Sequence, residues 1–321
     1  MIIVKAKNLL IVILASALLF TFFSCRGDDV GKGDGYTFVD DLGRSVTVDK
    51  PKRVAALIGS FAEIWQLAGG EVICAPDDAW TDFSLDMPED AVNLGNTKKP
   101  SLELLLSSDP DFVLASSMTR SDLDFLEILE SGGIPVAYFN VSGFDDYLRM
   151  LKICTDITGR SDLYEKNGTE IEGSIASVIE SSKRRVAERG KVSVLFLRAS
   201  SVSIRSKNSQ GNVTGEILYD LGCENIADSD SMLLENLNIE YIYAKDPDFI
   251  FIVQSGDDYD GMQKNLQKFI EDNPLWRELG AVKGDRVIFL EKRMYNLKPN
   301  ALWANAYLKL ETILSGYEKN K

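Results

Sequence analysis

Residues 103–114 read ELLLSSDPDFVL, and residues 240–251 repeat the same pattern as EYIYAKDPDFIF. Each copy predicts a short helix, an Asp-Pro break that ends it because proline cannot continue a helix, and a buried strand. Ser101 and Asn238 each lie two residues before the glutamate of their copy, where a residue of this type caps a helix. One structural unit therefore occurs in both halves of the chain, and this predicts two similar lobes around a cleft.

The segments around these two copies alternate between strand-like and helical patterns. A hairpin is predicted over 36–48, and short apolar runs predict strands at 54–58, 72–75, 112–115 and 136–140. The alternation resumes with 192–197, 216–221, 249–253 and 287–290, and it ends in a helix over 301–314. Because alternating strands and helices are typical of parallel sheets, we predict an α/β fold with two Rossmann-like lobes of parallel-rich sheets.

A long stretch between the two halves shows no strand signal. Its apolar residues recur at roughly helical spacing among polar ones, which predicts one connecting helix over 161–190. The predicted N-terminal α/β lobe is then 36–160, and the predicted C-terminal α/β lobe is 191–321. The 321 residues are enough for two domains of ordinary size.

The N-terminus has the layout of a lipoprotein signal peptide. Residues 1–24 contain two lysines and no acid, and their apolar run, 9–23, is shorter than the ~20 residues that a transmembrane helix needs. Cys25 follows a small residue and is the predicted lipidation site, and 25–35 is rich in Gly and Asp, as flexible tethers are. An uncleaved anchor is the alternative, because two phenylalanines stand where a lipobox normally has leucine and a small residue.

Composition excludes several classes of function. The net charge of −14 disfavours nucleic acid as a partner. The chain has no histidine, which rules out Ser-His and Cys-His catalysis and makes capture of bare zinc or manganese a poor hypothesis. We find no nucleophile elbow, Walker loop, dinucleotide fingerprint or Cys-x-x-Cys pair, so we expect no enzyme; a carboxylate-based hydrolase is the remaining catalytic alternative. Buried free thiols are predicted at Cys74, Cys154 and Cys223.

Four motifs together resemble a known family over residues 36–315. They are DDLGRSVTVDKPKRV at 40–54, SFAEI at 60–64, the first Asp-Pro-Asp copy, and DLGCEN at 220–225. The chain resembles the binding proteins of ABC importers that carry siderophores, haem and cobalamin. The resemblance implies two α/β lobes joined by one long helix and a lipid-anchored monomer outside the cytoplasm. It also implies delivery of a metal chelate to a permease dimer with its ATPase. A surface sensor or adhesin with the same fold is the alternative.

The resemblance also assigns a role to the repeated glutamates. In this family one surface glutamate on each lobe docks onto basic residues of the permease, and by position these are Glu103 and Glu240. The alternative is purely structural, because a carboxylate near a helix N-terminus stabilises the helix dipole by ~0.3–1 kcal/mol.

Ligands of open α/β sheets bind outside the carboxyl ends of the strands, so loops after predicted strands supply the candidate ligand contacts. Aromatic faces and guanidinium groups there suit a bulky, flat or anionic chelate, although each residue has packing or solvation as an alternative role. Because the chain has no histidine, haem would need Tyr or Met as its axial ligand. No cofactor and no metal site within the chain is predicted. The resemblance implies that the ligand is an iron chelate, haem or cobalamin. The candidates are Ser60, Trp80, Met118, Arg120, Arg198, Arg205, Gln254, Arg293 and Tyr295.

Overall fold

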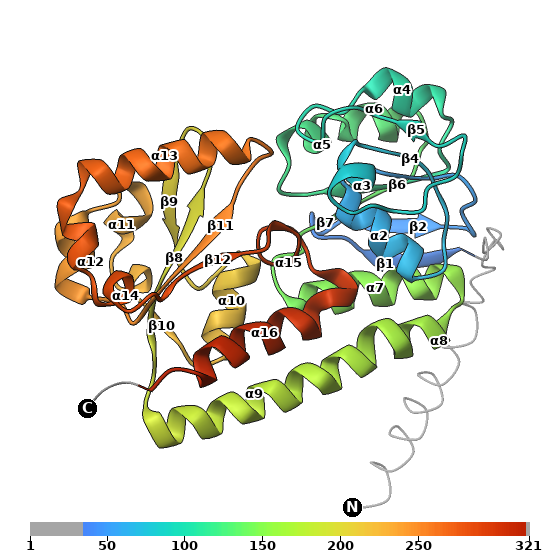
Figure 1. The fold of residues 1–321 in the computed structure, drawn as a ribbon. Coiled ribbons are helices and arrows are strands. Elements are labelled where there is room, and N and C mark those ends of the chain that lie inside the picture. Colours follow the sequence, from blue (N-terminus) through green and yellow to red (C-terminus); the bar gives the residue numbers. More distant parts are fainter. Residues whose placement is uncertain (1–34, 319–321) are drawn as a thin grey trace, which may run out of the picture. The chain divides into compact units, whose positions relative to one another are not determined.

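The computed structural model describes residues 35–318. The described residues from Tyr36 onward form one compact unit. Within the described residues the chain forms a two-stranded hairpin and two five-stranded sheets, one in each half (Figure 1). The predicted α/β fold class with two parallel-rich sheets is confirmed.

The N-terminal sheet is entirely parallel and has the strand order β5-β4-β3-β6-β7. Its strands are β3 (Val54–Ala56), β4 (Val72–Ala75), β5 (Val92–Asn93), β6 (Phe112–Ser116) and β7 (Val136–Phe139). The antiparallel hairpin is β1 (Tyr36–Val39) with β2 (Ser45–Val48). The helices are α2 (Gly59–Leu67), α3 (Asp78–Thr81), α4 (Leu102–Ser107), α5 (Arg120–Asp124), α6 (Leu126–Ser131) and α7 (Phe144–Thr158). Helices cover both faces of such a sheet, and its central strands are therefore continuous apolar runs.

The C-terminal sheet has the order β10-β8-β11-β12, with β9 paired to β8 as well. Its strands are β8 (Ser193–Ala199), β9 (Ile204–Lys207), β10 (Glu224–Asn225), β11 (Phe249–Gln254) and β12 (Val287–Leu290). The helices are α10 (Val213–Asp220), α11 (Ser231–Glu235), α12 (Ile239–Lys245), α13 (Tyr259–Asp272), α14 (Gly280–Lys283), α15 (Lys292–Tyr295) and α16 (Trp303–Ser315), with 3-10 turns at Ile226–Asp228, Pro274–Glu278 and Asn300–Leu302. β9 is antiparallel to β8, so the predicted loop 198–205 is instead the end of β8, a short turn and the start of β9.

The repeated sequence builds the same corner in both lobes. Ser101 and Asn238 cap α4 and α12 by accepting backbone N–H groups, as predicted. Both helices are followed by an aspartate in the left-handed conformation, Asp109 with φ 49° and Asp246 with φ 40°. Aspartate tolerates this conformation better than most residues because its short side chain bonds locally, so the Asp-Pro pair turns the chain sharply into the next strand.

The last aspartate of each copy ties two strands together. Asp111 accepts hydrogen bonds from the backbone N–H groups of Lys52 and Arg53 at 2.8 and 2.9 Å, just before β3. Asp248 accepts one from the backbone N–H of Ser193 at 2.9 Å, where β8 begins. These bonds fix the register between the repeated strand and the central strand of its sheet.

The connection between the lobes is helical from residue 161 to residue 189. It consists of α8 (Ser161–Tyr164), one π-helical turn (Glu165–Thr169) and α9 (Glu170–Arg189). At one end, Asn167 donates to the backbone oxygen of Leu67 in α2 at 2.8 Å. At the other, the buried guanidinium of Arg185 pairs with Glu311 of α16 at 2.9 Å. Because both ends are fixed, the helix restrains movement between the lobes.

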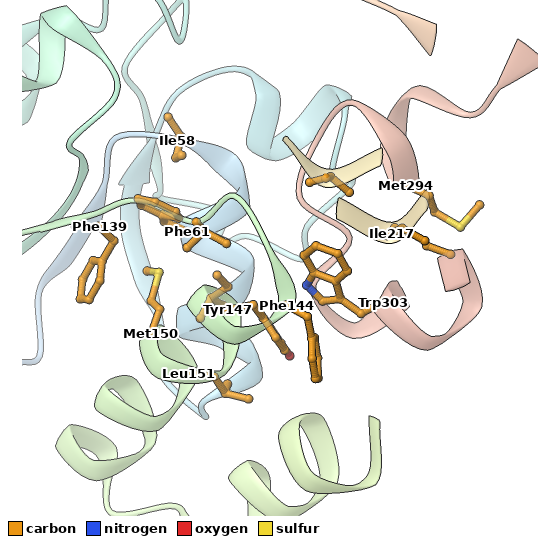
Figure 2. Close-up of a cluster of buried hydrophobic side chains, with 14 of the residues drawn as sticks. Ile58, Phe61, Phe139, Phe144, Tyr147, Met150, Leu151, Ile217, Met294 and Trp303 are labelled. Carbon is orange, nitrogen blue, oxygen red and sulfur yellow. The ribbon is translucent and has the colours of Figure 1, made fainter. Parts of the chain in front are cut away.

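The two lobes also share one hydrophobic core, which is continuous from the N-terminal sheet to α16 (Figure 2). At its centre Phe144 of α7 meets Trp303 of α16 edge to face, with ring centroids 5.8 Å apart. Burial of a side chain of the size of Phe144 contributes about 1.5–3 kcal/mol, so separation of the lobes here is costly. Alternate residues of β8 face this shared core and a second core within the C-terminal lobe.

Cys74, Cys154 and Cys223 are buried free thiols, as predicted. The predicted signal peptide, Cys25 and all of the tether except Gly35 lie outside the described residues. From residue 35 to residue 318, no helix is long and apolar enough to span a membrane.

Candidate ligand site

In both sheets, loops at the carboxyl ends of the parallel strands are linked by Lys292, in the segment that follows β12. The Nζ of Lys292 lies 2.8 Å from Asp82, in the loop after α3, and 2.6 Å from Asp257, in the loop after β11. One lysine thus bridges loops of both lobes, and the predicted position of the site, outside the strand ends, lies along this boundary. We call the loops after β3, β4, β6, β8, β11 and β12 the interlobe edge.

Cations of the C-terminal lobe gather at this edge. Arg198 of β8 lies directly opposite Arg205 of β9, and Lys207 lies two residues further along β9, on the same face. Like charges placed opposite each other destabilise a sheet. Lys298, from the loop after α15, adds a fourth positive charge close to Arg198. We call Arg198, Arg205, Lys207 and Lys298 the cation cluster.

The cation cluster is only weakly compensated by acids: the charge of Asp78 acts on Lys298, without forming an ion pair. Within residues 35–318 no ion pair joins any of its members to an acid, and the buried Nε of Arg198 has no hydrogen-bond partner there. Burial lowers the pKa of Arg198. Burial, then the charges of Arg198 and Arg205, lower the pKa of Lys207. Burial and then the charge of Arg198 lower the pKa of Lys298, opposed in part by the charge of Asp78. A bound anion would relieve this repulsion and supply the missing hydrogen bonds.

The N-terminal side of the edge is organised by two carboxyl groups. Asp78 accepts a hydrogen bond from the backbone N–H of Gly59 at 3.0 Å, at the start of α2. Asp122 is fully buried and accepts one from the backbone N–H of Ser116 at 2.9 Å. Burial, opposed by that hydrogen bond and aided by the charge of Asp78, raises the pKa of Asp122 to about 7. These bonds hold the loops after β3 and β6 in place.

The candidates from the N-terminal lobe lie in different environments. Ser60 is 4% exposed in the first turn of α2, and Trp80 of α3 is half-buried against the shared core. Met118, after β6, is 75% exposed. Arg120 is exposed and pairs with Asp124, one helical turn away, at 2.9 Å. Met118 is therefore freely accessible, Trp80 is partly accessible, and Ser60 is enclosed.

The candidates from the C-terminal lobe also differ in their partners and in their accessibility. Arg198 and Arg205 belong to the cation cluster, as described. Gln254, at the end of β11, donates to the backbone oxygen of Gly256 at 2.9 Å. Arg293 pairs with Glu63 of the other lobe at 2.6 Å. Tyr295 is 3% exposed and lies in the shared core, so it presents no surface to a ligand in this conformation.

Sequence reasoning missed Lys207, Lys298 and Glu63. Lys207 has the spacing of two from Arg205 that places both on one face of a strand, so recognition of β9 would have found it. Lys298 is 100 residues from Arg198, and Glu63 is more than 200 residues from Arg293 and Asn300, so no local pattern indicates these contacts.

Glu103 and Glu240 occupy equivalent positions. Each is exposed in the first turn of its helix, Glu103 in α4 and Glu240 in α12. Within the described chain neither has an ion-pair partner. Both carboxylates are thus accessible to a partner, whatever their effect on the helix dipole.

A cavity of about 820 Å³ lies between α7, α9 and α10, and its chemistry is opposite to that of the cation cluster. Its charged lining residues are all acidic: Asp145, Asp146, Glu172, Glu216, Asp220 and Asp228. Such a lining repels an anion. Within residues 35–318, no group of three or more His, Cys, Asp or Glu side chains is arranged to hold a metal ion.

A family model described as "Periplasmic binding protein" matches residues 54–294. The iron-uptake system-binding protein of Bacillus subtilis is 25% identical over 243 residues, which cover 74% of this chain and 71% of that protein. The Fe(3+)-citrate-binding protein YfmC of the same organism is 23% identical over 297 residues, 88% of each chain.

Solved structures show the same fold. Staphylococcus aureus SirA, complexed with staphyloferrin B, has a TM-score of 0.66 and 20% identity, covering 88% of this chain and 97% of its own. The haem-binding protein RhuT from Roseiflexus sp. RS-1, in apo form, has a TM-score of 0.67 and 18% identity, covering 83% and 98%. At these identities the likeness establishes the two-lobe architecture.

Proposed function

Because this chain belongs to the periplasmic binding protein family, we propose that it captures an anionic ferric chelate outside the cytoplasm and delivers it to the permease of an ABC importer. Its role is to bind and release the chelate, without chemical conversion. Relatives named for iron uptake and for Fe(3+)-citrate support the choice of an iron chelate.

The cation cluster carries this proposal. Arg198 and Lys298 are half-buried, come from separate segments and repel each other. Hydrogen bonds to charged groups contribute about 1.5–3 kcal/mol each, and the planar guanidinium matches a carboxylate bidentately. A chelate with several carboxylates would therefore be held more tightly than a neutral one, which gives these cations no countercharge.

Delivery needs a surface that the permease can recognise. Glu103 and Glu240 are exposed at matching places in the two lobes, so together they offer two carboxylates to basic residues of a permease dimer. Lipidation at Cys25 would keep the protein at the membrane, where the permease lies. A relative described as a putative ABC transporter substrate-binding lipoprotein, YhfQ of Bacillus subtilis, supports both parts of this proposal.

The test is a panel of ligands titrated into the compact unit Tyr36–Lys321, with quenching of tryptophan fluorescence as the readout. Ferric citrate should bind saturably, and its affinity should fall as ionic strength rises, because added salt screens the charges. A neutral ferric hydroxamate, haem and cobalamin should bind more weakly. Preference for the neutral chelate, or binding of ferric citrate that salt does not change, would contradict the proposal.

A further inference from the structure

Glu63 lies at the centre of a contact between the lobes. It belongs to α2, and both of its carboxylate oxygens accept hydrogen bonds from Arg293 of α15, at 2.7 and 2.6 Å. The amide nitrogen of Asn300 donates to the same carboxylate at 2.5 Å and to the backbone oxygen of Ser60 at 2.9 Å. Phe83 stacks against the guanidinium of Arg293, 4.3 Å from its ring centroid. A carboxylate of one lobe thus holds two residues of the other.

The same contact reaches Lys298 of the cation cluster. The second terminal nitrogen of Arg293 donates to the backbone oxygen of Lys298 at 2.7 Å. Two residues later Asn300 is fully buried and has φ 53°, a left-handed conformation that non-glycine residues rarely adopt. The chain around Lys298 is therefore held from both sides by residues bonded to Glu63.

Resting on the proposed function, we propose that Glu63 is a positioning residue: through Arg293 and Asn300 it fixes the segment 291–302 so that Lys298 joins Arg198 before the chelate arrives. Glu63 itself is occupied by these two partners and does not contact the ligand. Groups held in their bound arrangement lose little conformational freedom on binding, so a cation cluster prepared in advance binds more tightly.

A positioning role and simple electrostatics predict opposite changes in chelate affinity for the same substitution. Glu63→Gln removes a negative charge close to a site for an anion, and by Coulomb's law alone this should tighten binding. If Glu63 positions Lys298, the same substitution releases Arg293 and weakens binding. The sign of the change in affinity therefore distinguishes the two.

The experiment is calorimetric titration of ferric citrate into Tyr36–Lys321, comparing Glu63→Gln with wild type. The matched control is Glu278→Gln, which breaks the exposed ion pair with Lys283, 2.7 Å long, and changes the net charge equally. Positioning predicts a loss of about tenfold for Glu63→Gln and no loss for the control. Unchanged or tighter binding by Glu63→Gln would overturn the inference.

Two further arms keep the outcome decisive. If Glu63→Gln does not fold, Arg293→Lys replaces it, because lysine keeps the charge but cannot bond both Glu63 and the backbone of Lys298. Weaker binding then supports the inference, and unchanged binding overturns it. If wild type binds no chelate, the proposed function fails. Hydrogen exchange of the segment 291–302 then tests the positioning alone: faster exchange in Glu63→Gln supports it, and equal exchange overturns it.

Discussion

Asp122, at the interlobe edge, makes the stability of the folded protein depend on pH. Its carboxyl group is fully buried, and its pKa in the folded protein is about 7, well above the ordinary 3.8. The folded state therefore holds this proton up to higher pH than the unfolded state. The stabilisation that results is complete below about pH 4 and is lost as pH rises through 7.

Replacement of Asp122 by Asn should remove this dependence. The amide oxygen can still accept the N–H of Ser116, and no ionisation penalty remains at alkaline pH. We expect the melting temperature of Asp122→Asn, relative to wild type, to be higher at pH 8 than at pH 5 by about 3 °C or more. Asp124→Asn, an exposed acid of the same helix, is the control. An equal difference at both pH values would show that Asp122 does not titrate in this range.

Individual residues could be predicted where a local pattern decides their role. The caps Ser101 and Asn238 follow from their distance to the repeated glutamates, and the structure confirms both. Arg293 illustrates the limit. Its place after a strand predicted a ligand contact, which stays a prediction. Its ion pair with Glu63 could not be predicted, because no pattern near either residue reveals it.

At the scale of elements, the hairpin of β8 and β9 was missed for a physical reason. β9 reads IRSK and lacks the apolar run that marked the other strands. Its turn is closed by a backbone bond between Ser200 and Ser203 at 2.8 Å, and serine-rich stretches are equally typical of loops. Pairing with the neighbouring strand β8, and not an apolar pattern of its own, therefore decided this element.

The helices α4 and α12 carry the prediction for docking. The double variant Glu103→Ala and Glu240→Ala should strongly reduce chelate uptake by cells with the complete importer, because the permease loses both carboxylates. Affinity of the purified protein for the chelate should not change, because both residues are exposed at the starts of α4 and α12.

The control for docking is a double alanine variant of Glu180 and Glu188, exposed acids of α9. It should leave uptake intact. Normal uptake by the Glu103/Glu240 variant would contradict the docking role, and loss of chelate affinity would instead make the two glutamates part of the fold or of the ligand site.

At the scale of the whole molecule, the repeated sequence was enough to predict two lobes, because each copy specifies a helix, a break and a strand. The shared core was not predictable. Phe144 and Trp303 are separated by more than 150 residues, and their contact depends on how the lobes pack. The same packing brings the loops of both lobes together at the interlobe edge.

The shared core and the fixed connecting helix predict that the lobes close little on binding. Asn167 anchors the connection to one lobe, and the buried pair of Arg185 and Glu311 anchors it to the other. Small-angle scattering of Tyr36–Lys321 should give the same radius of gyration with and without saturating ferric citrate. A clear compaction on addition of the chelate would show that the lobes move as hinged bodies.

The central claim, that the cation cluster binds an anionic chelate, is tested most directly by calorimetric titration of ferric citrate into wild type, Lys298→Met and Lys283→Met. Methionine keeps most of the length of the lysine side chain and removes its charge. Lys283→Met removes an equal charge from an exposed ion pair elsewhere. We predict an affinity loss of at least about tenfold for Lys298→Met, the value of one charged hydrogen bond, and little change for Lys283→Met. Equal affinities for all three proteins would contradict the account.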